Sequence, residues 1–240
     1  MTSSDPTTDQ SHVLRQAVAE REAALADPYA FIEYMGRSGH PDFAHPPALH
    51  HVIMIDAFLR LMAGEFDRLL VMAPRGSAKS TYFSVILATY YFLTNPTHKV
   101  LACSNTTELA EGFNRRRRSV IASPQFEQLT DYRLDPNNQG SGEWAVSPQD
   151  SSLSLPHGGA MRAGGVGSSI IGFRADLLIL DDPIKSREES MSPTILSKHW
   201  EWYQSDARPC LKPTGKEVIV STRWSANDIP GRIILSLIHI

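Results

Sequence analysis

The sequence predicts a three-layer α/β fold with a mostly parallel central sheet. Apolar runs long enough to form buried strands recur along the chain, and segments with helical spacing separate them. These runs lie at 69–73, 97–104, 176–181 and 216–221. Parallel strands covered by helices on both faces read as continuous apolar runs of this kind. Because ligands bind at the carboxyl ends of such strands, the polar residues that follow each run are the candidate site.

Length and composition allow one large α/β domain, or one domain plus an appendage. The chain has 240 residues, of which 42% are hydrophobic and 20% charged, enough for a sizeable core. A net charge of −3 excludes a global basic field, so any contact with nucleic acid has to be local. Only Cys103 and Cys210 are present, which excludes a disulfide framework and fits a reducing cytoplasm. The N-terminus lacks an apolar signal core and no apolar run approaches ~18 residues, so we expect a soluble intracellular protein with no membrane span.

The N-terminal part of the chain predicts helices ahead of the sheet. Residues 1–11 are rich in Ser, Thr and Asp and are expected to form a disordered tail. Helical spacing then predicts helices at about 11–25, after Asp27-Pro28 with Phe31, Ile32 and Met35 on its apolar face, and at about 48–63. The expected division is a tail (1–11), an N-terminal helical appendage (12–47) and a main domain (48–240).

Residues 68–81 have the layout of a phosphate-binding loop. An apolar strand is followed by a tight loop and then by Lys-Ser-Thr at the start of an amphipathic run, Tyr82–Leu93. Lys79 would neutralise the β- and γ-phosphates, and the Ser80 hydroxyl would reach Mg²⁺. The candidate phosphate-binding residues are Pro74, Arg75, Gly76, Ser77, Ala78, Lys79, Ser80 and Thr81.

The match to the strict pattern G-x-x-x-x-G-K-[ST] is imperfect. That pattern requires glycine where this chain has Ala73 and Ala78. Alanine adopts a positive φ only at an energetic cost, and its Cβ occupies space where backbone would approach phosphate. An ordinary strand-to-helix turn with Lys79 on a solvated first turn therefore remains open from this stretch alone.

A second candidate group follows the strand at 176–181. The strand ends in two carboxylates, of which Asp181 is expected to orient Mg²⁺ or its water and Asp182 to polarise the attacking water. The alternative is an exposed pair in which one Asp caps a helix. The strand at 216–221 ends in Ser221 and Thr222, which can sense a γ-phosphate. The alternative there is that Arg223 and Trp224 only close the edge of the sheet.

Four consecutive arginines, Arg115–Arg118, form a dense basic cluster on the predicted helix that follows Asn105-Thr106-Thr107. At about 100° per residue they cannot share one helix face. We expect a solvated surface with one side chain lying over the core. Contact with DNA phosphates or an acidic partner subunit is the alternative.

Several other segments give weaker predictions. His50 and His51 are either capping or surface residues, or lie near the base of a bound nucleotide. Residues 125–149 are expected to be irregular, and 153–161 to form a hairpin turning at 157–159. The glycine-rich run 163–169 indicates a mobile loop or a close approach of backbone to another group.

Together these residues resemble the ATPase half of a bacteriophage terminase large subunit, the motor protein that packages viral DNA. The resemblance covers the chain from about residue 28 to its end. Four segments carry it: 73–81 resembles the family's deviant Walker A motif, which often contains Pro-Arg; 103–126 resembles its strand and Glu-Leu-Ala…Phe…Arg helix; 172–183 resembles its Walker B region; and 221–232 resembles its ATPase-coupling motif. The last two are quite specific.

The resemblance implies a P-loop NTPase of the ASCE type that binds ATP and Mg²⁺. Lys79 and Ser80 would bind phosphate and metal. Asp181 would be the Walker B acid and a metal ligand, and Asp182 the catalytic carboxylate.

The resemblance also implies roles beyond the nucleotide. Ser221, Thr222 and Arg223 would form the coupling motif, in which Thr222 links hydrolysis to movement. Arg174 would be an arginine finger or sensor, with Arg75 as the competing residue. The implied partners are double-stranded DNA, a portal protein, a small terminase subunit and further copies of the chain in a ring, in the cytoplasm of an infected bacterial host.

Three departures from the family pattern leave other functions open. Ala73 and Ala78 replace glycines, and Asp182 is one methylene shorter than the usual Glu, a difference of roughly 1 Å. The nuclease domain expected after the ATPase is absent from this chain, so no cleavage is predicted for it. The alternatives are another P-loop motor of helicase type, or a truncated module that binds nucleotide without turnover.

Overall fold

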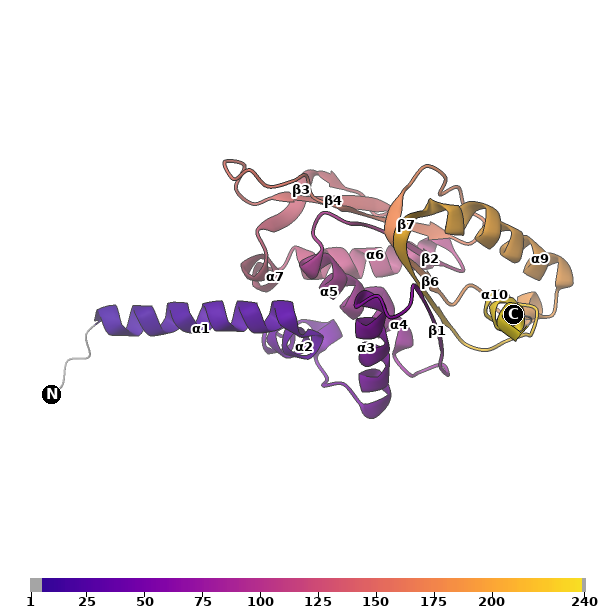
Figure 1. Ribbon diagram of the computed structural model, residues 1–240, viewed down its shortest axis with the longest axis horizontal. Coiled ribbons are helices and arrows are strands. Elements are labelled where there is room, and N and C mark those ends of the chain that lie inside the picture. The colour runs from indigo at the N-terminus through magenta and orange to yellow at the C-terminus, as the bar shows by residue number, and fades with distance from the viewer. Residues whose placement is uncertain (1–5, 239–240) are drawn as a thin grey trace.

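The computed structural model has three layers, with helices on both faces of one central sheet (Figure 1). It describes the backbone of residues 6–238 and the side chains of residues 12–236. The strands are β1 Arg68–Met72, β2 Lys99–Ser104, β3 Tyr132–Gln139, β4 Glu143–Pro148, β5 Ala160–Gly165, β6 Ala175–Asp181 and β7 Leu211–Ser221. The predicted α/β class and the four predicted strands are confirmed.

Helices account for most of the remaining chain. They are α1 Pro6–Ala26, α2 Pro28–Arg37, α3 Leu49–Met62, α4 Lys79–Thr81, α5 Leu87–Thr94, α6 Thr107–Ile121, α7 Pro124–Leu129, α8 Arg187–Ser190, α9 Pro193–Trp202 and α10 Ile229–Ile238. Four short 3-10 or π segments join them: η1 Pro41–Phe43, η2 Tyr82–Ile86, η3 Tyr203–Ala207 and η4 Arg208–Cys210. Because η2 directly links α4 to α5, residues 79–94 form one continuous helix with a π turn inside it.

The strand order is β1-β7-β6-β2-β5-β4-β3. The first five strands are parallel, and β4 and β3 are antiparallel to their neighbours. β7 separates β1 from β6, which is the additional strand of an ASCE-type P-loop sheet. In register, Met72 lies opposite Ser221, and Asp181 lies opposite Val220. The carboxyl ends of β1, β7 and β6 therefore meet at one edge of the sheet.

Successive residues of the central strands point into two different cores, as pleating requires. On β6, Leu177 and Ile179 join the core under α2, α3 and α5, whereas Leu178 and Leu180 join the core under α9 and η3. All four side chains are at most 1% exposed. The continuous apolar run of β6 thus reflects burial on both faces.

The helix predicted to be amphipathic at Tyr82–Leu93 is buried on every side, so that prediction is wrong. One side of this helix faces the sheet and the other is covered by helices from the N-terminal segment and by α6. A helix enclosed in this way has no solvated face on which polar residues would be needed.

The N-terminal helices share the core of the sheet. Phe31, Ile32 and Met35 of α2 are buried, as predicted, in the same cluster as residues of α5 and β6. α1 extends away from the body in Figure 1, and its Val13 and Leu14 are exposed. Residues 1–5 of the predicted tail lie outside the described residues, and the rest of it belongs to α1. The domain boundary at residue 47 stays a prediction.

Residues 125–161 differ from their prediction. Instead of irregular chain, they hold α7 and the antiparallel pair β3–β4, and no hairpin turns at 157–159. Gly159 leads into β5, where an added Cβ would lie 1.8 Å from the carbonyl oxygen of His98. The glycine-rich run begins inside buried β5 rather than in a mobile loop, so close backbone approach is the correct alternative.

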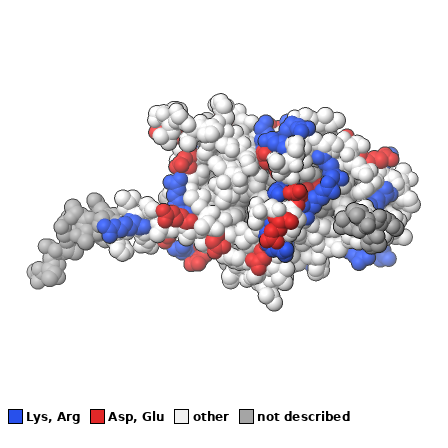
Figure 2. All heavy atoms as spheres, viewed as in Figure 1, with Lys and Arg blue, Asp and Glu red and all other residues white. Residues whose placement is uncertain are grey.

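The four arginines do not form a solvated surface. Arg117 is fully buried, Arg116 pairs with Asp42, and Arg118 donates to the Gln139 carbonyl; only Arg115 is exposed. Figure 2 shows basic and acidic side chains lying next to one another on the face it presents. Among the described residues, no helix is both long and apolar enough to cross a membrane.

We predict that Phe31→Ala lowers the free energy of unfolding of the whole domain by about 3–5 kcal/mol. The Phe31 side chain is 0% exposed and packs against Phe43, Tyr90 and Phe126, so truncation leaves a cavity in the shared core. Denaturant unfolding should show one transition at lower midpoint, whereas Val18→Ala on exposed α1 should change little. A separate early transition for the N-terminal helices, with the main one unmoved, would contradict a shared core.

Candidate functional site

The loop after β1 adopts the backbone shape of a phosphate-binding loop despite its alanines. The Ala73 amide donates to the Ser221 carbonyl at 3.1 Å, which fixes the loop to the end of β7. Gly76 and Ala78 both have positive φ, 80° and 54°, and helix α4 begins at the next residue. Ala78 therefore occupies the left-handed conformation that favours glycine, at a cost of roughly 1–2 kcal/mol. Because the first turn of a helix leaves its backbone amides without helical partners, an anion is favoured at this point.

Lys79 forms an ion pair with Asp182. The Nζ–Oδ2 distance is 2.8 Å, and the Lys79 side chain is only 6% exposed. Asp182 has a φ of 43°, and its amide donates to the Val220 carbonyl at 2.8 Å. The structure thus brings together two predicted residues that follow β1 and β6. A solvated Lys79 on an ordinary turn is excluded.

Asp181 lies in a buried cradle of hydroxyl groups. Its Oδ1 accepts from Ser80 at 2.9 Å and its Oδ2 from Ser84 at 2.7 Å, and the residue is 1% exposed. Burial raises the pKa of Asp181 to about 6, against the opposing effect of the two serines. Asp181 and Asp182 are therefore not an exposed pair, since the first is enclosed and the second is half-buried.

The end of β7 contacts the same carboxylates. The Thr222 amide donates to Asp182 Oδ1 at 2.7 Å, and the Ser221 hydroxyl donates to the Thr222 carbonyl at 2.9 Å. The Thr222 Oγ1 is buried with no hydrogen-bond partner among the described residues. Arg223 is exposed. Of the three predicted coupling residues, Thr222 makes the direct contact with the site.

The two candidate arginines lie in different places. The Arg75 guanidinium stacks over the Trp224 ring, 4.6 Å from its centroid, and so joins the phosphate loop to the segment after β7. Arg174 precedes β6 and donates to the Pro209 carbonyl. At about 3.3 Å per residue, the seven residues of β6 separate it by roughly 23 Å from Asp181. Arg174 therefore does not belong to this group of residues.

A cavity of about 300 Å³ lies beside the loop, lined in part by His45, His51, Ala78, Tyr82 and Arg116. His51 stacks on the Tyr82 ring at 4.0 Å. The Nε2 atoms of His50 and His51 lie 3.2 and 3.0 Å from the Ser77 carbonyl oxygen. The two histidines therefore contact the phosphate loop itself.

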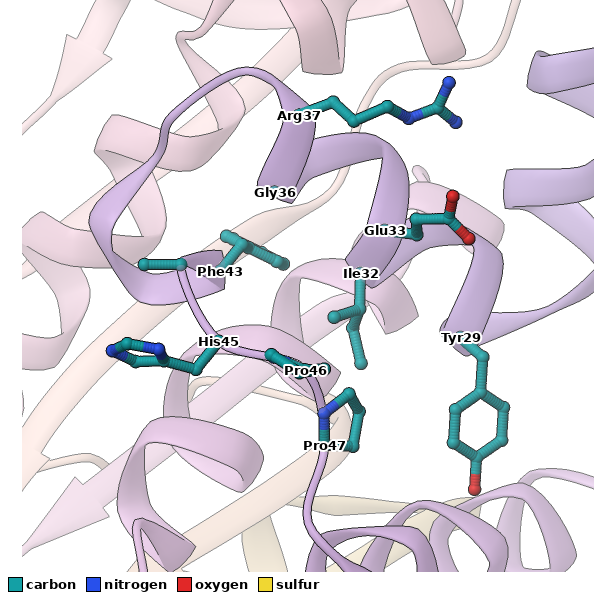
Figure 3. A pocket seen from close by; sticks show the side chains of 10 residues that line it. Tyr29, Ile32, Glu33, Gly36, Arg37, Phe43, His45, Pro46 and Pro47 are labelled. Carbon is teal, nitrogen blue, oxygen red and sulfur yellow. The ribbon is translucent and has the colours of Figure 1, made fainter.

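A second cavity, of about 550 Å³, lies away from these carboxylates. It is formed by α2 and by the segment from Phe43 to Pro47, and Figure 3 shows Tyr29, Ile32 and Pro47 lining it. None of the predicted site residues lines this cavity.

The donor set at Ser80 and Asp181 fits Mg²⁺. Both side chains offer oxygen atoms, the ligands that Mg²⁺ prefers, and the two oxygens lie 2.9 Å apart. No group of three or more His, Cys, Asp or Glu in the described part of the chain could hold a metal. Mg²⁺ at nucleotide sites takes only one or two protein ligands and completes its shell with phosphate and water, so the pair is sufficient.

Sequence reasoning missed three residues of this region: Ser84, Asn105 and Arg117. Ser84 lies one turn after Ser80, and a polar residue at that spacing in an otherwise apolar helix was the available signal. The Asn105 side chain donates to the Asp182 carbonyl at 3.1 Å. Arg117 donates to the Ser84 carbonyl at 2.6 Å, and no sequence pattern distinguished it from its three neighbours.

A family model for the N-terminal part of the T4-like-virus type of terminase large subunit matches residues 70–225. The match covers more than half of the chain and contains the phosphate loop, both carboxylates and Thr222. The chain belongs to this family. A search of curated protein sequences found no significant match.

Solved terminase structures share the fold. The chain resembles a mutant of the large terminase ATPase domain of Thermus phage P74-26, with 18% identity, a TM-score of 0.51 and coverage of 74% of this chain and 66% of that one. It also resembles the HK97 bacteriophage large terminase, with 13% identity, a TM-score of 0.52 and coverage of 81% and 37%. The chain therefore spans only part of these terminases.

A weaker likeness is to the large terminase of another thermophilic bacteriophage in complex with ATP-γ-S. Identity is 9%, the TM-score is 0.42, and 73% of this chain and 38% of that chain are covered. A likeness at this level carries no argument about the present site.

We predict that Ala78→Gly stabilises the protein by about 0.5–1 kcal/mol, because glycine relieves the strain of the positive φ and loses only part of that gain to backbone entropy. Ala73→Gly is the matched control, since Ala73 is not among the described residues with positive φ. It should destabilise the protein by a similar amount. Denaturant midpoints measure both changes, and a loss of stability in both variants would contradict the assigned strain.

We predict that Asp181→Asn raises stability at pH 7 by about 1–3 kcal/mol. The pKa of Asp181 is raised in the folded state, so folding favours its protonated form. Wild-type stability should therefore fall as pH rises from about 4 to about 6 and stay lowered above that range. Asn resembles the protonated form and removes this loss. Unfolding curves of both proteins at pH 4 and 7 should converge at the lower pH, and a constant difference would contradict the prediction.

Proposed function

We propose that this chain hydrolyses ATP to drive double-stranded viral DNA into a procapsid, as the ATPase unit of a terminase large subunit. One observation carries the proposal: Lys79 and Ser80 of the loop meet Asp182 and Asp181 at the end of β6, within 2.8 and 2.9 Å. Phosphoryl transfer needs this combination of a cation, a metal ligand and a carboxylate that can orient water. Membership of the terminase family supports the direction in which the energy is used.

The ion pair indicates what ATP binding changes. Lys79 is held near the loop by Asp182, and an arriving phosphate offers its ammonium a stronger anionic partner. Exchange of Lys79 from carboxylate to phosphate leaves Asp182 Oδ2 free, while the Thr222 amide still holds Oδ1. The freed oxygen can then accept a proton from the attacking water. Mg²⁺, held by Ser80 and Asp181, would neutralise developing charge on the phosphate oxygens.

Thr222 is suited to couple this change to movement. Its amide binds the carboxylate that exchanges partners, and it directly follows β7, whose next segment carries Trp224 and leads into α10. A shift of Asp182 therefore acts on the segment between β7 and α10. Arg75, stacked on Trp224, would feel the same shift.

Two further assignments complete the nucleotide site. We infer that the base occupies the cavity beside His51 and Tyr82, because it adjoins the loop and offers a stacked aromatic wall. Arg75 is the arginine that can act on the nucleotide of its own subunit. Arg174, at the opposite end of β6, could reach only the nucleotide of a neighbouring subunit.

The remaining assignments rest on the family. They are double-stranded DNA as substrate of translocation, a portal protein and a small terminase subunit as partners, a ring of identical subunits, Mg²⁺ as cofactor, and the cytoplasm of an infected bacterial host as location. No continuous basic surface appears on the face shown in Figure 2, so DNA contacts are expected to be local.

We predict that Lys79→Ala abolishes ATP turnover and that Asp182→Asn retains ATP binding but loses hydrolysis by at least about a hundredfold. Turnover is measured as phosphate release, and binding with a fluorescent ATP analogue. Lys198→Ala, an exposed lysine on α9, is the control and should behave as wild type.

Three results would contradict the proposal. Unchanged turnover in Lys79→Ala would overturn the phosphate-loop assignment. Wild-type binding without hydrolysis at any subunit concentration would indicate a nucleotide-binding module. DNA unwinding without portal-dependent packaging would indicate a motor of helicase type.

A further inference from the structure

Arg117 is a buried cation without a carboxylate in contact. It lies on α6, which packs against η2 and β2, and its side chain is 0% exposed. Its Nη1 donates to the Ser84 carbonyl at 2.6 Å and its Nη2 to Asn114 Oδ1 at 3.4 Å. Its Nε has no partner, and no ion pair among the described residues includes it. A charge left in this state destabilises a core unless something nearby offsets it.

The charge that offsets it is the carboxylate of Asp181. Burial lowers the pKa of Arg117 to about 9, and the opposing effect comes first from Asp181. A methionine or leucine would fill the same volume without this burden. The presence of a guanidinium here therefore indicates a role directed at Asp181 rather than at packing.

Ser84 physically joins the two groups. Its carbonyl accepts from Arg117, and its hydroxyl donates to Asp181 Oδ2 at 2.7 Å. Ser84 lies within the π turn of η2, and such turns occur frequently at functional sites. Because one residue binds both partners, displacement of its backbone by loss of Arg117 would move the hydroxyl that orients Asp181.

The guanidinium is itself held from the other side. Asn114 Oδ1 accepts from Trp144 Nε1 at 2.9 Å as well as from Arg117, and Asn114 Nδ2 donates to the Ser141 carbonyl at 2.8 Å. Trp144 is 0% exposed and belongs to β4. A continuous buried polar chain therefore runs from the β3–β4 pair through α6 to Asp181.

We propose that Arg117 is a positioning residue for the divalent cation: through Ser84 it fixes the orientation of the Asp181 carboxylate. Arg117 does not touch nucleotide or metal and acts only through the residue between them. The inference rests on the proposed function, because it takes Asp181 to be a metal ligand. Residues that orient metal ligands in this way typically change metal affinity about 10–100-fold when they are replaced.

Arg117→Met tests the proposal, with Arg115→Met as the matched control on the same helix. Arg115 is exposed and its only ion pair among the described residues is with Glu111, so its replacement should leave metal binding unchanged. Mn²⁺ binding is followed by electron paramagnetic resonance with a non-hydrolysable ATP analogue present, and analogue binding without metal is measured separately. We expect Arg117→Met to weaken Mn²⁺ at least about tenfold while metal-free analogue binding stays within about twofold of wild type.

The sign of the change separates orientation from charge. Removal of a positive charge near a metal site would by itself strengthen cation binding, so tighter or unchanged Mn²⁺ binding in Arg117→Met overturns the proposal. Arg117→Lys keeps the charge but lacks the two-pronged donor, and it should remain weakened. Full recovery of metal affinity by Lys would indicate charge alone and would also overturn it.

Stability is controlled with a second variant. Should Arg117→Met not fold, Ser84→Ala removes only the hydroxyl that links the chain to Asp181 and should weaken Mn²⁺ to a similar degree; unchanged binding there overturns the proposal. Wild-type protein that binds neither analogue nor Mn²⁺ would instead overturn the proposed function and this inference with it. Wild-type binding with unaffected variants would overturn the inference alone.

Discussion

The ion pair between Lys79 and Asp182 joins two strands that are not neighbours in the sheet. β7 lies between β1 and β6, so the pair has to form across the end of β7. It can do so because all three strands are parallel and end in register. The Thr222 amide, at the end of β7, then binds the same carboxylate. The whole site thus depends on one strand being inserted between the two that carry its chemistry.

The site concentrates charge in a region that excludes water. Lys79 and Arg117 supply two cations, and Asp181 and Asp182 supply two carboxylates, each held by a short chain of hydrogen bonds or an ion pair. Such a group is tolerated in a core only when every charge has a counter-charge or a donor near it. An incoming nucleotide and metal ion bring charges of both signs, so partner exchange within the group can occur without leaving any of them unpaired.

Sequence could predict the parts of the fold whose burial is simple. β6 and β7 read as apolar runs because both faces are covered. β3 and β4 were missed because most of their side chains are exposed or half-buried, and polar residues such as Asn137 and Gln139 carry no strand signal. The inward direction of Arg117 was not predictable from four identical residues, since helix geometry says that they diverge but not which one meets the core. Lys79, Asp181 and Asp182 were predictable because chemistry constrains their type and order.

The alanine at position 78 shows how a loop can keep its shape without its usual glycine. Ala78 and Asp182 are the non-glycine residues of positive φ in the described part of the chain, and they flank the Lys79–Asp182 pair. Strained backbone persists only where surrounding contacts over-determine it. Here the Ala73 amide is bound by Ser221, and the Ser77 carbonyl lies within 3.2 Å of both His50 and His51. The neighbouring strand and α3 therefore hold the loop in a conformation that its own residues do not favour, and this makes the two histidines part of the phosphate site's support.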